Sequence, residues 1–176
     1  MKSVVKYFLD FYFYSSLHIS IAAVLLTLES YLFFSISIDI YYLLFVFFST
    51  LLIYSMHRII GLRKLKGQTN QGRFIVIRKY KHHIRIYAII SLLALIWILI
   101  QMDTRYILFL IPAGIISVLY TFPVLLKGKR LRDYNYIKIF LIAVVWAYVC
   151  GMLPVLYTEG MGLPVLISGL EKAIFF

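Results

Sequence analysis

The segment Tyr54-Ser-Met-His-Arg-Ile-Ile-Gly-Leu-Arg-Lys-Leu-Lys66 joins the end of a long apolar run to a stretch that is rich in positive charge. Neither Asp nor Glu occurs between Ile40 and Met102. An apolar helix that continues into a cation-rich loop is typical of a membrane span that ends on the cytoplasmic side, where Lys and Arg accumulate. The segment therefore predicts the end of a transmembrane helix and the start of a cytoplasmic loop.

The composition of the whole chain points to the same class of protein. Hydrophobic residues make up 63% of its 176 residues and charged residues 14%, whereas soluble domains average about 45–50% and about 25%. A soluble core of this size cannot hide so much apolar surface, so the expected partner is the lipid bilayer. The net charge of +11 would suggest nucleic acid in a soluble protein. Cytoplasmic loops account for this charge, and we expect no nucleic-acid partner.

Apolar runs close to the roughly 20 residues that a bilayer core requires divide the chain into several expected spans. We predict an all-α, multi-pass transmembrane helical bundle with about five spans and a short apolar C-terminal segment. The bundle is expected to form a single domain over 1–176, or one half of a larger bundle. The segment 161–176 is either a sixth span or a surface segment. The five expected spans are 8–28, 38–56, 86–101, 106–126 and 137–157.

The distribution of Lys and Arg predicts the orientation of these spans. Nine of them occur between positions 57 and 85, five between 127 and 138, and two more at Lys2 and Lys6. Five spans put all three of these regions on one side, and the loops on the other side hold Asp39, Asp103 with Arg105, and Glu159. The positive-inside rule then predicts that the N-terminus and the basic loops lie in the cytoplasm. We expect the protein to lie in the cytoplasmic membrane of the cell.

The first expected span has one face of small residues at steps of three and four. A packing seam between helices is favoured over the wall of a cavity, because small residues let membrane helices approach closely. The residues of this face are Ser16, Ser20, Ala23, Thr27 and Ser30.

Two ionisable residues, His18 and Glu29, also share a face of the first span, and ionisable groups at membrane depth are functional candidates. We expect a neutral His18 that is hydrogen-bonded to a neighbouring helix, and a Glu29 that meets water near the outer end of the span.

Cys150, the one cysteine of the chain, is expected to be a small buried hydrophobe. Pro112 and Pro154 are expected to bend their helices. Six tyrosines near span ends predict an interfacial belt: Tyr41, Tyr42, Tyr54, Tyr106, Tyr120 and Tyr157.

Two segments carry a resemblance to a known family. One runs from Leu51 to Lys64, and the other is Tyr120-Thr-Phe-Pro-Val-Leu-Leu-Lys-Gly-Lys-Arg130, followed by an aliphatic span that contains Trp146. From about Tyr14 to Pro154 the chain resembles the N-terminal half of the UbiA superfamily of intramembrane prenyltransferases. The resemblance implies a helical bundle with a lateral cavity and a polyprenyl diphosphate bound through magnesium, which two Asp-rich motifs hold.

The chain departs from this family at the first Asp-rich motif, Asn-Asp-x-x-Asp-x-x-x-Asp. Its key positions here are Tyr54, Ser55, Arg58 and Leu62, and none can replace the carboxylates that magnesium prefers. Arginine can instead contact a diphosphate directly through its planar fork of donors. We therefore predict a degenerate, inactive relative with no catalytic residue and no metal, which binds an anionic lipid or a diphosphate. The candidate binding residues are Arg58, Tyr120, Lys129 and Arg130.

Two alternatives stay open. The first is an active prenyltransferase, which moves a prenyl group from a polyprenyl diphosphate to an aromatic acceptor with Mg, or which completes its site with a partner subunit or a second copy of itself. The second is a non-enzymatic accessory or scaffold subunit of the membrane. The sequence alone does not separate these hypotheses from the degenerate relative.

Overall fold

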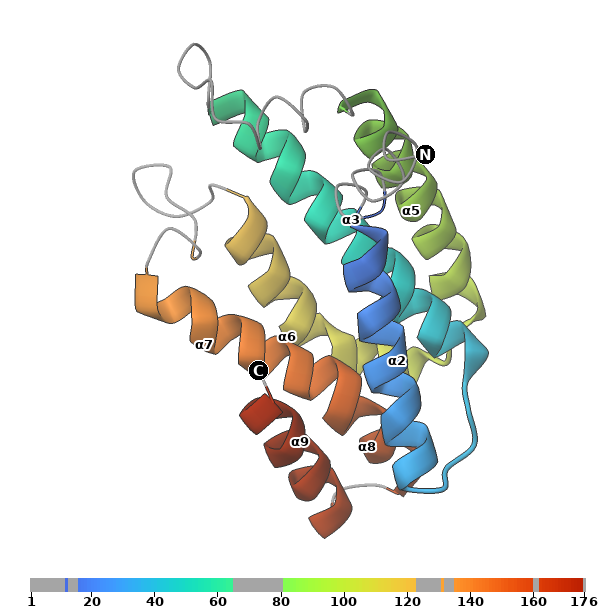
Figure 1. Cartoon of the computed structure of the whole chain (residues 1–176). Helices are drawn as coiled ribbons and strands as arrows, with labels where there is room; N and C mark the ends of the chain where they lie inside the picture. Colours follow the sequence, from blue (N-terminus) through green and yellow to red (C-terminus); the bar gives the residue numbers. More distant parts are fainter. Residues whose placement is uncertain are drawn as a thin grey trace, which may run out of the picture.

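The computed structural model describes residues 12, 16–64, 81–122, 131, 135–159 and 162–175. These residues are almost entirely helical, and no strand occurs among them (Figure 1). The predicted all-α class is therefore confirmed. In chain order the helices are α2 (Leu17–Phe33), α3 (Ile40–Lys64), α5 (Lys81–Gln101), α6 (Thr104–Thr121), α7 (Asn135–Trp146), the π-helix η3 (Ala147–Met152), α8 (Leu153–Glu159) and α9 (Leu163–Phe175).

Among the described residues, four helical segments are long and apolar enough to cross a membrane. The surface of α5 illustrates why such helices suit lipid: large apolar side chains at Ile89, Leu93, Ile96 and Ile100 are exposed at helical spacing. In water this surface would be unfavourable, whereas lipid tails solvate it. The composition of the chain and the exposed apolar side chains of these helices thus both support the predicted class of membrane protein. The four segments are Ile40–Gly61, Lys81–Gln101, Thr104–Thr121 and Ile139–Thr158.

The limits of the helices differ from the expected spans. The first expected span is 8–28, whereas the described helix α2 begins at Leu17. It follows Ser16, whose φ of 67° is left-handed. At 17 residues and about 1.5 Å per residue, α2 is about 25 Å long, a little less than a bilayer core of about 30 Å. α3 continues to Lys64 instead of ending at 56, because a helix satisfies its own backbone after leaving the lipid.

α3 packs against three other helices of the bundle, α2, α5 and α6. Its most extensive contacts are with α5, and α2 packs on it as well. The C-terminal ends of α3 and α6 and the N-terminal ends of α2 and α5 lie toward the top of Figure 1, while α9 and the connection from α2 to α3 lie toward the bottom. Chain segments that the sequence predicts on one side of the membrane therefore leave the bundle at one end.

The small-residue face of α2 is a packing seam, as predicted. All five of its residues are buried, and α2 packs against both α3 and η3. Ser20, Thr27 and Ser30 each donate a hydrogen bond to the carbonyl four residues earlier. These hydroxyls are satisfied within their own helix, so the face can pack closely against its neighbours without a polar partner there.

The π-helix η3 follows from the proline that comes after it. Proline has no N–H, and its ring collides with the carbonyl four residues before it, here that of Cys150. The Leu153 N–H donates to the Tyr148 carbonyl, five residues earlier. The residue five positions after Val149 is Pro154, which has no N–H to donate. The carbonyl of Val149 is therefore left without a helical donor, and such bulges often mark functional sites.

Candidate functional site

Two of the four predicted binding residues lie at the same end of the bundle. Arg58 is in the C-terminal part of α3, and Tyr120 is one residue from the C-terminal end of α6. The ring of Tyr120 meets that of His57, with 5.2 Å between the centroids and an interplanar angle of 75°. Since Arg58 follows His57, the contact brings this part of α3 beside the end of α6. Lys129 and Arg130 lie outside the described residues.

His57 is a residue of this site that the sequence did not single out. Its ring also meets that of Tyr54 edge-to-face, at 6.0 Å and 87°. Both contacts fall within the range of about 4.5–7 Å that aromatic pairs prefer. Tyr54 and His57 are three residues apart and share one face of α3, which is a signal that the sequence does carry. Their contact with Tyr120, from a different helix, is not visible in the sequence.

The residues at this end do not fit magnesium. The positions of the expected Asp-rich motif hold Tyr54, Ser55, Arg58 and Leu62, and a guanidinium repels a divalent cation. In the part of the chain that the structure describes, no group of three or more His, Cys, Asp or Glu side chains could hold a metal ion. The half-buried Arg58 can donate paired hydrogen bonds to phosphate or carboxylate oxygens. The chemistry that these side chains support is anion binding.

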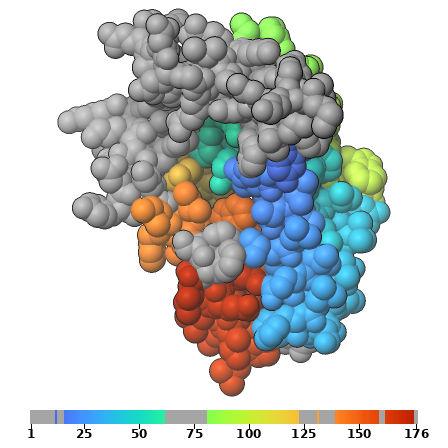
Figure 2. All heavy atoms as spheres, in the orientation of Figure 1, coloured from blue at the N-terminus to red at the C-terminus, as the bar shows by residue number. Residues whose placement is uncertain are grey.

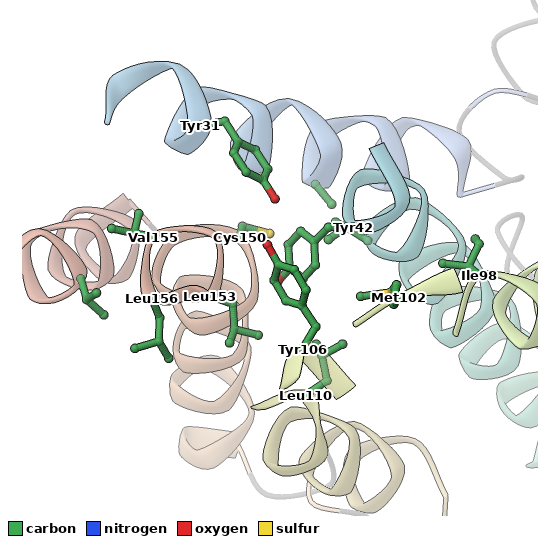
Figure 3. Close-up of a cluster of buried hydrophobic side chains, with 13 residues drawn as sticks. Tyr31, Tyr42, Ile98, Met102, Tyr106, Leu110, Cys150, Leu153, Val155 and Leu156 are labelled. Carbon is green, nitrogen blue, oxygen red and sulfur yellow. The ribbon is translucent and has the colours of Figure 1, made fainter. Parts of the chain in front are cut away.

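A second cluster, the tyrosine core, lies where α3 and α6 begin and shows that part of the predicted belt is buried. Tyr42 and Tyr106 are buried, and together with Tyr31 they converge around Cys150 (Figure 3). The rings of Tyr42 and Tyr106 stack with 5.0 Å between centroids, and Tyr157 stacks on Tyr106 at 3.7 Å. Tyr42 and Tyr106 are packed inside the protein, so they do not belong to an exposed belt. The expectation of a buried Cys150 is confirmed.

Tyr42 can be buried because its hydroxyl has a partner inside the protein. The hydroxyl donates to the Val149 carbonyl at 2.6 Å, which is the carbonyl that Pro154 leaves without a helical donor. Tyrosine is tolerated in a core when its O–H reaches such an acceptor. The hydrogen bond therefore ties α3 to η3 and gives the Val149 carbonyl a donor.

Asp103 organises the exposed edge of the tyrosine core. Its carboxylate accepts hydrogen bonds from the backbone N–H of Arg105 at 2.8 Å and from the Tyr157 hydroxyl at 2.8 Å. The Arg105 guanidinium pairs with it at 3.1 Å and lies over the Tyr157 ring at 5.4 Å. The hydrogen bonds from Arg105, first from its backbone and then from its side chain, lower the pKa of Asp103 from 3.8 to about 2. The carboxylate caps α6 and links it to α8.

The short helix α9 brings a charged residue into the interior. The side chain of Lys172 is only 4% exposed and forms an ion pair with Glu29, whose side chain is 43% exposed. The expectation that Glu29 simply meets water is therefore incomplete. Within the segment 161–176, Leu163–Phe175 form a helix of 13 residues, which is shorter than a span of about 20 residues and packs against η3.

These three places join residues from different helices: the basic end around His57, the tyrosine core around Tyr42, and the ion pair of Glu29 with Lys172. The first of these places includes the cation Arg58 and lies where α3 and α6 end. No protein-family model, curated protein or solved structure matches the chain.

Proposed function

We propose that the protein is a multi-pass protein of the cytoplasmic membrane that binds an anionic lipid or a polyprenyl diphosphate at the basic end of its bundle, without a metal. The N-terminus and the basic loops face the cytoplasm, and the chain is a degenerate relative of the UbiA superfamily. The observation that carries the proposal is the contact of His57 with Tyr120. It places Arg58 beside the end of α6, after which Lys129 and Arg130 follow in the chain.

The charge of this region supports the proposal. Cations near an anionic membrane surface gain about 1 kcal/mol each, and the sequence between Ile40 and Met102 contains no Asp or Glu. Arg58 is half-buried, and a charge that is partly withdrawn from water interacts more strongly with an anion than one at the surface. The rings of His57 and Tyr120 contact each other beside this part of α3.

In the experiment, the purified protein in mild detergent is titrated with geranylgeranyl diphosphate, with and without magnesium. Binding is measured as the change in stability against thermal unfolding. At 100 times its dissociation constant a ligand adds about 2.7 kcal/mol to the stability of the folded state. We expect stabilisation that needs no magnesium and that Arg58→Ala abolishes. Arg105→Ala is the matched control, since Arg105 is exposed and pairs with Asp103 at a distance from this end.

Phosphatidylglycerol distinguishes the two sources of the anion. Equal stabilisation by both ligands identifies a lipid headgroup site, and stabilisation by the diphosphate alone identifies a polyprenyl site. No stabilisation by either ligand, or an equal loss in Arg58→Ala and Arg105→Ala, would overturn the proposal in favour of an accessory subunit. A strict requirement for magnesium, together with a prenylated product, would instead support the active transferase.

A further inference from the structure

α9 is attached to the bundle by a narrow stripe of residues. The buried positions follow the spacing i, i+3, i+4 and i+7, so they share one face, and this face lies against η3. It offers one branched apolar side chain, a hydroxyl, a glycine and a lysine, while the opposite face exposes Leu163, Leu166, Leu170 and Ile174. The attached residues are Val165, Ser168, Gly169 and Lys172.

Two glycines set the separation of α9 and η3. A Cβ atom at Gly169 would lie 2.7 Å from the side chain of Met152, and one at Gly151 would lie 2.8 Å from Lys172 Cγ and 2.9 Å from the Ser168 carbonyl. The helices thus touch nearly backbone to backbone. Within a bilayer such packing contributes dispersion contacts but little hydrophobic driving force, because lipid tails are equally apolar. The interface needs a further, specific connection.

The ion pair of Lys172 with Glu29 supplies that connection, and its two partners are in unequal surroundings. The ammonium is buried and the carboxylate is half-exposed. α2 and α9 both pack on η3 and appear on one face of the molecule (Figure 2). Glu171 also lies 3.8 Å from the Lys172 ammonium, but it belongs to α9 itself and cannot tie this helix to α2. A buried ammonium that loses its partner is strongly unfavourable.

We propose that the ion pair of Glu29 with Lys172 is a latch that holds α9 on the bundle, and that loss of the charge on Glu29 releases α9 as a unit. With Glu29 neutral, the docked α9 keeps a buried ammonium with only Glu171 nearby. When α9 undocks, Lys172 reaches water or lipid headgroups. The other helices stay together, because the stack of Tyr42 on Tyr106 joins α3 to α6 without α9.

The test measures the distance between α2 and α9 in the full-length chain by double electron–electron resonance. Spin labels replace Leu25 and Leu166, each 58% exposed, as Leu25→Cys and Leu166→Cys in a Cys150→Ala background. A control pair combines Leu25→Cys with Leu93→Cys on α5, where the side chain is equally accessible. The control pair reports the bundle without α9.

We expect one narrow distance in the parent protein. Glu29→Gln should add a longer distance and raise the undocked fraction at least tenfold, which corresponds to about 1.4 kcal/mol. Adding Lys172→Met should remove this population, because the buried charge is gone. The control pair should stay unchanged throughout.

Three results would overturn the proposal: an unchanged distance in Glu29→Gln, a long-distance population that survives Lys172→Met, or equal broadening of the control pair, which would mean that the whole bundle loosens. If the Glu29→Gln variant cannot be produced in folded form, the double variant Glu29→Lys with Lys172→Glu, which exchanges the two charges, tests the latch instead. It should keep α9 docked, and an undocked population in this variant would contradict the latch.

Discussion

Replacing Tyr42 by phenylalanine tests the link between the tyrosine core and the π-helix. The Tyr42 hydroxyl donates to the Val149 carbonyl at 2.6 Å, and Pro154 leaves that carbonyl without a helical donor. Tyr42→Phe keeps the ring that stacks on Tyr106 and removes only the O–H. An unpaired buried acceptor costs about 1–3 kcal/mol, whereas hydrogen bonds between membrane helices average about 0.6 and reach about 1.7 kcal/mol. We expect a loss of about 1–2 kcal/mol.

Tyr148→Phe is the matched control. It removes the same atom, but the Tyr148 hydroxyl donates to the Phe109 carbonyl at 2.8 Å in an exposed position. Water or headgroups can replace that hydrogen bond, so the loss should stay within about 0.5 kcal/mol, as for most surface changes. Denaturant unfolding in mixed micelles, followed by circular dichroism, measures both variants. A Tyr42→Phe protein as stable as Tyr148→Phe would refute the dependence of the Val149 carbonyl on the Tyr42 hydroxyl.

The remaining predictions concern the close packing of α9 and the cap of α6. Gly151→Ala should lower the free energy of unfolding by about 1–3 kcal/mol, which is the usual cost of overpacking. The new methyl group would lie only 2.8 Å from Lys172 Cγ. Gly114→Ala, with nothing within 4 Å, should be neutral or stabilising by up to about 1 kcal/mol in the same unfolding assay. The pKa of Asp103 is lowered from 3.8 to about 2, so its stabilisation is present above pH 3.8 and lost as the pH falls through 2. The melting temperature should fall over this window in the parent and less in Asp103→Asn; equal pH profiles would contradict the role of the carboxylate.

Features that depend on the local pattern could be predicted from the sequence. Apolar runs of the right length predict the helical membrane bundle, because every helix satisfies its own backbone and needs only an apolar exterior. The small-residue periodicity of Ala23 and Thr27 predicts a packing face, and the run around Cys150 predicts its burial. Each of these depends on residues within a few helical turns of one another.

Features that depend on contacts between distant helices could not be predicted in this way. A tyrosine near a span end has the same sequence signature whether it meets headgroups or, like Tyr42, finds a carbonyl 107 positions away. His57 becomes part of a site only through a ring on α6.

The sequence by itself determined that this chain is a helical membrane bundle with a cation-rich region, since hydropathy and charge act residue by residue. The tertiary structure decided which polar groups are paired. Glu29 and Lys172 are 143 positions apart. In the sequence Glu29 looks like an isolated charge in an apolar run, and Lys172 is paired with nothing except its neighbour Glu171. The packing of α2 and α9 on the same π-helix brings them together, and a buried charge is tolerated only where its partner arrives in three dimensions.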